Sequence, residues 1–176
     1  MTEGRNRKVE LHFDADALGR CSADDIAALT DAATQSTYYR DGLTPEQLAA
    51  IRRIVDISAE TCTKAAENQH QLLVGAFIDD KLGGFLISTC HAADNREIDW
   101  MMVHPSHHGL GVGAALMRTG IEWLDPSQPQ WLNVVAHNDR AINFYRKYGF
   151  EIDGPLTPPK AIDQWIMRRP GGLPLS

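Results

Sequence analysis

The sequence predicts an α/β (α+β) fold in which a mixed central β-sheet of six to seven strands is flanked by about four helices. Three observations support this fold class. Two helix start signals lie in the first third of the chain, two apolar segments joined by a short acidic turn at 79–81 follow, and the second half alternates helical and strand patterns. Hairpin strands followed by strand, helix, strand and helix indicate a mixed sheet with helices packed on it. We expect one domain over residues 1–176, with its core at about 8–169 and a frayed tail at 170–176.

The first two helices are predicted from their capping residues. Ser22 with Asp25 three residues later resembles a capping box. Thr44, Pro45 and Gln47 combine a threonine cap, a proline at the first helical position and a glutamine at the third. The expected helices lie at 23–33, 45–67, within 109–124 and at 140–148. The expected strands lie at 9–13, 72–78, 82–90, 97–103, 131–136 and 162–168.

The composition is typical of a soluble globular protein and argues against several classes of function. The chain has 176 residues, of which 43% are hydrophobic and 23% charged. A net charge of -6 argues against a nucleic-acid partner, which requires a basic face. Cys21, Cys62 and Cys90 lack metal-ligand spacing and indicate reduced thiols. Because the start lacks the apolar region of a secretory leader and no apolar run reaches the ~20 residues of a membrane helix, we expect a cytoplasmic protein without a membrane partner.

The segment 104–116 contains three glycines at alternate positions, Gly109, Gly111 and Gly113, directly before a predicted helix. Glycines allow the backbone to approach a ligand closely, and the free N–H groups at a helix start attract anions. The segment therefore predicts a site for a phosphate or pyrophosphate.

Two familiar phosphate-binding motifs fit this segment poorly. A nucleotide-binding P-loop requires a lysine, which the loop lacks. A dinucleotide fingerprint matches Gly109, Gly111 and Ala114, but 105–108 separate these glycines from their strand. The strand that follows also runs into His137 and Asn138 rather than ending near an acidic residue for the ribose.

A third motif matches more closely. Val103-His104-Pro105 followed by Gly111-x-Gly113 is similar to the pyrophosphate loop of the GNAT superfamily of N-acetyltransferases. His108 occupies the place of the family's arginine or glutamine, which is a departure.

A second motif lies downstream in the family's order and spacing. It resembles the GNAT strand-helix segment and consists of Leu132-x-Val134-x-x-x-Asn138-x-x-Ala141-x-x-Phe144-Tyr145-x-Lys147-x-Gly149-Phe150. Gly149 has a plain physical role, because it would end the helix in a left-handed conformation. The two motifs together cover about fifty residues.

The resemblance implies the GNAT fold and direct attack of a neutral primary amine on acetyl-CoA, with no metal. It implies that the backbone N–H groups of Met101 and Val103 hold the pantetheine and acetyl group, and that Asn138 contacts the pantetheine. The cofactor-binding residues that we expect are Met101, Val103, His108, Gly109, Leu110, Gly111, Val112, Gly113, Ala114, Asn138 and Tyr145.

The expected catalytic residues are Tyr145, Glu97 and Asp99. Tyr145 is the candidate general acid, because a phenol (pKa ~10) stays protonated at neutral pH. If side chains alternate along the strand, Glu97 and Asp99 share a face with Met101 and Val103. Glu97 is then the first candidate base, and Asp99 is an alternative base or a contact for the ammonium group of the substrate.

Three histidines are further candidates. His91 and His137 could also act as the base, although a lone histidine is more often structural. His108, with an ordinary pKa of ~6.5, predicts that CoA binding tightens as the pH falls from ~8 to ~6.

The resemblance implies a small-molecule or peptide amine as acceptor, whose identity the sequence does not reveal. It also implies that the segment 36–41, with its two tyrosines and one arginine, borders the acceptor pocket. A non-catalytic GNAT-like protein that binds acyl-CoA for sensing is the alternative function. A nicotinamide-dependent oxidoreductase rests on the dinucleotide fingerprint alone. A homodimer is a common arrangement in the family.

Overall fold

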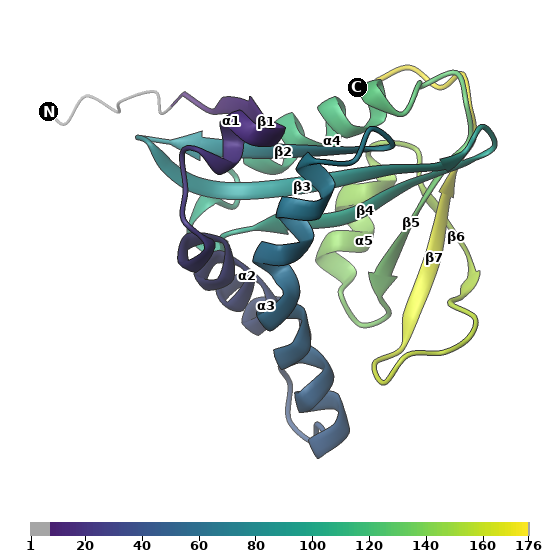
Figure 1. Cartoon of the computed structure of the whole chain (residues 1–176). Coiled ribbons are helices and arrows are strands. Elements are labelled where there is room, and N and C mark those ends of the chain that lie inside the picture. Colours follow the sequence, from purple (N-terminus) through teal and green to yellow (C-terminus); the bar gives the residue numbers. More distant parts are fainter. Residues whose placement is uncertain (1–7, 176) are drawn as a thin grey trace, which may run out of the picture.

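The structure, a computed structural model, describes residues 8–175. Its centre is a seven-stranded sheet in the order β1-β2-β3-β4-β5-β7-β6 (Figure 1). All neighbouring strands are antiparallel except β4 and β5, which are parallel. The strands are β1 (Glu10–Phe13), β2 (Gln71–Ile78), β3 (Lys81–Ala92), β4 (Asn95–Val103), β5 (Gln130–Val135), β6 (Glu151–Pro155) and β7 (Gln164–Arg169). The mixed sheet confirms the predicted fold class.

Helices cover both faces of the sheet. Those of at least five residues are α1 (Asp14–Leu18), α2 (Ala23–Tyr38), α3 (Pro45–Ala66), α4 (Val112–Trp123) and α5 (Asp139–Arg146), and a 3-10 turn spans Pro105–His107. The helices α4 and α5 pack with Leu86 and Ile98 on one face. On the opposite face, α2 and α3 pack with Phe85 and Ile87.

Both predicted capping boxes are present. Ser22 Oγ accepts a hydrogen bond from the Asp25 N–H at 3.1 Å, and Thr44 Oγ1 accepts one from the Gln47 N–H at 3.2 Å. The helix α2 runs to Tyr38, five residues beyond the expected end, because no glycine or proline interrupts it.

The hairpin between β2 and β3 turns at Asp79 and Asp80, as predicted. Both residues have positive φ, 51° and 59°, which suits the two-residue turn that matches the twist of the flanking strands. Aspartate tolerates this conformation better than most residues. The short α1 and the edge strand β6 were not predicted, because five-residue elements carry too little periodicity to identify.

Hydrogen bonds reach into the tail that we expected to fray. Arg169 is fully buried, and its guanidinium donates to the carbonyls of Tyr148, Pro126 and Leu173. The Gly172 N–H also donates to the Pro126 carbonyl, at 2.9 Å. A buried guanidinium with carbonyl partners fixes the chain on both sides of it.

Within residues 8–175, no helix is both long and apolar enough to cross a membrane.

Candidate active site

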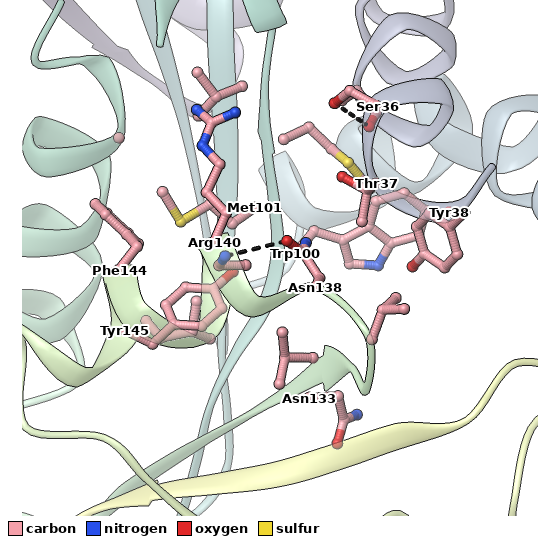
Figure 2. A pocket seen from close by; sticks show the side chains of 18 of the residues that line it. Ser36, Thr37, Tyr38, Trp100, Met101, Asn133, Asn138, Arg140, Phe144 and Tyr145 are labelled. Atoms are coloured by element: carbon pink, nitrogen blue, oxygen red, sulfur yellow. Dashed lines mark hydrogen bonds between the residues drawn. The ribbon is translucent and has the colours of Figure 1, made fainter. Parts of the chain in front are cut away.

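A pocket of about 910 Å³ opens where β4 and β5 separate. Its wall comes from α2, α3, β4, β5, the loop before α4, α5 and the loop between β6 and β7. Figure 2 shows Arg140, Phe144 and Tyr145 entering from α5 on one side and Tyr38 from α2 on the other, with Met101 between them.

The separation of β4 from β5 leaves backbone donors unpaired. The two strands pair only at Glu97 with Trp131 and at Ile98 with Leu132, and they diverge beyond this point (Figure 1). The next residue after β4, His104, donates its N–H to the Gly83 carbonyl on the β3 side. Since successive N–H groups of a strand point to opposite sides, those of Met101 and Val103 point toward the open side facing β5.

A β-bulge at Asp99 reverses the alternation of side chains along β4. In the register with β3, Ile87 pairs with Trp100 and Ser88 with Ile98, so that Asp99 is the extra residue. Met101 therefore packs with Ile98 on the α4 side, while Trp100 packs on the α2 side. The expectation that Glu97 and Asp99 share a face with Met101 and Val103 is wrong, because it assumed unbroken alternation.

The two carboxylates instead lie on the α2 side of β4. Glu97 pairs with Thr89 of β3, and the Thr89 hydroxyl donates to Asp99 Oδ2 at 3.0 Å. Glu97 is only 7% exposed, and its Oε2 lies 2.6 Å from His91 Nε2. Both carboxylates still line the pocket. Because of the bulge they lie on its α2 side, whereas Met101 lies on its α4 side.

Burial raises the pKa of both carboxyl groups. For Glu97 the next cause is the neighbouring charge of Asp99, while the hydrogen bond from His91 acts in the opposite direction. For Asp99 the hydrogen bond from Thr89 and the charge of His91 oppose the rise in pKa. Lys160, from the loop between β6 and β7, also lowers the pKa of both groups.

The glycine loop lies at the opposite end of the pocket. Gly109 and Gly111 have φ values of 80° and 85°, a conformation that favours glycine, and no atom lies within 4 Å of a Cβ built on either. A Cβ on Gly113 would lie 3.4 Å from Phe144 and 3.5 Å from Met101. The loop therefore leaves open space at the start of α4, where free N–H groups favour an anion.

Most of the expected cofactor residues come together in the pocket wall, and two do not. The wall includes Met101, Val103, His108, Gly109, Gly111, Gly113, Ala114, Asn138 and Tyr145. The Leu110 side chain is 40% exposed and lies outside the wall, and Val112 is buried in the core. Any contribution of these two residues to a ligand comes from their backbone.

Residues 31–150 match the model of the acetyltransferase (GNAT) family. The chain belongs to this family. An uncharacterized N-acetyltransferase of Mycobacterium tuberculosis (strain ATCC 25618 / H37Rv) is 28% identical over 141 residues, which cover 77% of this chain and 86% of that protein. A mycothiol acetyltransferase of Mycobacterium sp. (strain JLS) is 35% identical over 78 residues, 41% of this chain and 26% of that protein.

Solved structures share the GNAT fold. The PaiA N-acetyltransferase from Thermoplasma acidophilum, solved in complex with coenzyme A, superposes with a TM-score of 0.70 at 19% identity. The match covers 93% of this chain and 99% of that one. These findings confirm the resemblance inferred from the two motifs.

His108 and Arg140 form the polar part of this GNAT pocket near the glycine loop. The pKa of His108 is lowered by burial first and then by the neighbouring charge of Arg140. His108 is therefore less protonated near neutral pH than an ordinary histidine, and any rise in CoA affinity from its charge moves to lower pH than for an ordinary histidine. Arg140 brings a permanent positive charge to the pocket wall, which the sequence reasoning missed.

Two tyrosines, Tyr38 from α2 and Tyr145 from α5, line the pocket on opposite sides. Burial raises the pKa of Tyr38 to about 12. Burial also raises the pKa of Tyr145, and Tyr38 adds to this shift. Both phenols are therefore protonated at neutral pH. The ring of Tyr145 packs against Phe144 and Phe150, which fixes its direction.

The remaining candidates divide clearly. Asn138 caps α5, because its Oδ1 accepts a hydrogen bond from the Ala141 N–H at 3.1 Å. His91 contacts Glu97 and stacks on Trp131, and neither His91 nor His137 is part of the pocket wall. In the segment 36–41, Ser36, Thr37 and Tyr38 line the pocket, and the exposed Tyr39 and Arg40 do not.

Among residues 8–175, no group of three or more His, Cys, Asp or Glu side chains could hold a metal ion.

The raised pKa of Glu97 gives a prediction about stability. Below the ordinary value near 4.5 the stabilising contribution of protonated Glu97 is fully present, and it is lost as the pH rises through the raised folded-state pKa. Glu97→Gln should therefore gain thermal stability relative to wild type as the pH is raised from about 4.5 to 8. Melting temperatures across this range measure the difference. The matched control is Glu122→Gln on the exposed part of α4, whose difference from wild type should stay flat. A constant difference for Glu97→Gln would contradict the assigned burial penalty.

Proposed function

We propose that the protein transfers the acetyl group of acetyl-CoA to a primary amine by direct attack. One observation carries this proposal: the N–H groups of Met101 and Val103 point to the open side of β4, inside a single pocket. The glycine loop lies at one end of this pocket and two carboxylates at the other. The family and the relatives named N-acetyltransferase support the same class of reaction.

The residues present fit acetyl-CoA. Gly109 and Gly111 leave open space at the start of α4, where N–H groups would bind the pyrophosphate. The Arg140 guanidinium lies near His108 and would supply the fixed charge that the histidine lacks. The N–H groups of Met101 and Val103 would hold the pantetheine arm and the thioester carbonyl.

Bound acetyl-CoA supplies a thioester whose C–S bond breaks as the C–N bond forms, while the amine loses one proton and the thiolate gains one. The backbone donor on β4 stabilises the negative charge that develops on the carbonyl oxygen, because it is already oriented. Tyr145 is the proton donor, since its raised pKa keeps the phenol protonated.

Glu97 is the proposed acceptor, through a water molecule, of the proton that a protonated amine must lose before it attacks the thioester. Its raised pKa brings the carboxylate closer to the ideal of a base with a pKa near the working pH. His91 contacts Oε2, which orients the carboxylate and leaves Oε1 available to the water.

Release of the CoA thiol from acetyl-CoA in the presence of alkylamines tests the function. Tyr145→Phe should lower kcat by about 100-fold, because it removes the proton donor. The KM for acetyl-CoA should stay within about 3-fold, because the ring is kept. Tyr39→Phe, which changes an exposed tyrosine outside the pocket, is the control.

Two results would contradict the proposed function. Binding of acetyl-CoA without thiol release for any amine would favour a non-catalytic acyl-CoA sensor. Stabilisation by NADH and not by acetyl-CoA would favour an oxidoreductase.

Arg140 provides a second prediction, on cofactor affinity. Arg140→Ala should weaken CoA binding by about 10- to 100-fold, because a charged hydrogen-bond donor to phosphate is lost. His108→Gln should change the affinity by less than about 3-fold at pH 7.5, because the histidine is already neutral there. Titration calorimetry with CoA measures both values.

The control for this prediction is Arg146→Ala, because Arg146 lies on the same helix, contacts Asn143 and Glu151, and is not part of the pocket wall. A larger loss for His108→Gln than for Arg140→Ala would show that the histidine is the phosphate ligand.

A further inference from the structure

The bulge at Asp99 divides the pocket into two parts with different chemistry. Met101 and Val103 pack toward α4, on the side of the glycine loop. Glu97 and Asp99 lie on the α2 side, at the other end of the pocket. We call this second part the acceptor side. It is lined by Ser36, Thr37, Tyr38, Ala50, Ile51, Ile54, Glu97, Asp99, Trp100, Asn133, Lys160 and Ile162.

The Asp99 carboxylate on the acceptor side is oriented by a chain of hydrogen bonds. The Oδ2 atom of Asp99 accepts a hydrogen bond from the Thr89 hydroxyl at 3.0 Å, and Thr89 Oγ1 in turn accepts one from Gln71 Nε2 at 3.0 Å. These contacts hold the carboxylate in one direction and leave Oδ1 for a ligand. A ligand that donates hydrogen bonds complements this arrangement.

Asn133 adds an independent observation. It lies two residues after Trp131, the partner of Glu97, and therefore on the same face of the sheet as Glu97. Its Oδ1 is buried and has no hydrogen-bond partner among the described residues, although the side chain lines the pocket. Buried carbonyl oxygens are normally paired, so this one calls for an N–H donor from a ligand.

The charges on the acceptor side favour a cation. Glu97 and Asp99 face Lys160 from the opposite loop and His91 from the end of β3. Lys160 brings one positive charge to the acceptor side, against the two carboxylates of Glu97 and Asp99.

Part of the remaining wall of the acceptor side is apolar. Ile51 is only 1% exposed, and it packs with Ile162 and the ring of Tyr38. Such a surface suits a hydrocarbon body.

We propose that the acceptor is a compact protonated alkylamine with an apolar body and no carboxylate beside the amine, held by Asp99 and Asn133. This inference rests on the proposed function and names its substrate class. The ammonium group donates to Asp99 Oδ1 and Asn133 Oδ1, and it gives up one proton to Glu97 through water before the C–N bond forms. The second N–H proton, lost as the amide forms, replaces the proton that Tyr145 gives to the CoA sulfur. Asp99 and Asn133 thus determine specificity, while Glu97 takes part in the chemistry.

Matched acceptors test the proposal directly. Isoamylamine and leucine share a side-chain body and differ in the carboxylate, as do phenethylamine and phenylalanine. Thiol-release assays should give a kcat/KM at least about 10-fold higher for each amine, because the added carboxylate meets two like charges. Glucosamine, a polyhydroxylated amine, should also be a poorer substrate than isoamylamine.

Two variants distinguish a loss of amine recognition from a folding defect. Asp99→Asn should raise the KM for isoamylamine by about 10- to 100-fold, and Asn133→Leu should raise it by about 10-fold, since each removes an acceptor for a charged donor. The Kd for acetyl-CoA should stay within about 2-fold in both, which a folding defect would not allow. Asp24→Asn, on the exposed start of α2, is the control and should match wild type.

The outcomes distinguish the two levels of the proposal. Preference for leucine or glucosamine over isoamylamine, or an unchanged amine KM in Asp99→Asn, would overturn the acceptor class and leave acetyl transfer intact. Absence of thiol release with every acceptor would overturn the proposed function and the acceptor class together.

Discussion

The separation of β4 from β5 is the constraint on which the rest of the site depends. In most sheets a parallel neighbour would take the N–H groups of Met101 and Val103, and here pairing stops at Ile98. The strand β5 is held on its other edge by six residue pairs with β7, from Gln130 to Val135. The sheet therefore stays continuous while one side of β4 remains open. Open backbone donors in a concave site can bind a ligand without any change in the fold.

The bulge at Asp99 gives this opening its two chemical sides. By adding one residue to β4, it sends Trp100 toward α2 and Met101 toward α4. The carboxylates then face the acceptor side, while the glycine loop and Arg140 face the side proposed for the cofactor. Opposite charges at the two ends of one pocket would keep an anionic cofactor and the proposed cationic acceptor apart. The same separation places Glu97, the proposed base with its raised pKa, away from the glycine loop.

The sequence predicted the parts of this structure that depend on local chemistry. Ser22 and Thr44 cap their helices through contacts three residues away, and Gly149 has the left-handed φ of 84° expected of a helix end. The glycine loop and the strand-helix motif also lie in continuous segments, so they could be recognised. The bulge at Asp99 depends on the pairing of β4 with β3, and no pattern in the neighbouring sequence indicates it.

Long-range contacts explain the other differences. Arg169 reaches Tyr148 and Pro126, 21 and 43 residues away, so the order of the tail could not be read from its proline and glycine content. Arg140 looked like an ordinary helix residue, and only the fold brings it near His108. The basic residue two positions after the capping Asn138 was the available signal.

The most direct test of this account is a titration of the isotope-labelled protein with acetyl-CoA, followed by the chemical shifts of its backbone amides. If the open side of β4 holds the cofactor, the largest changes will fall on Met101, Val103 and the glycine loop at 109–114, with smaller changes on α3. Saturating acetyl-CoA that leaves the Met101 and Val103 amides unchanged would contradict the central role assigned to the separation of β4 and β5.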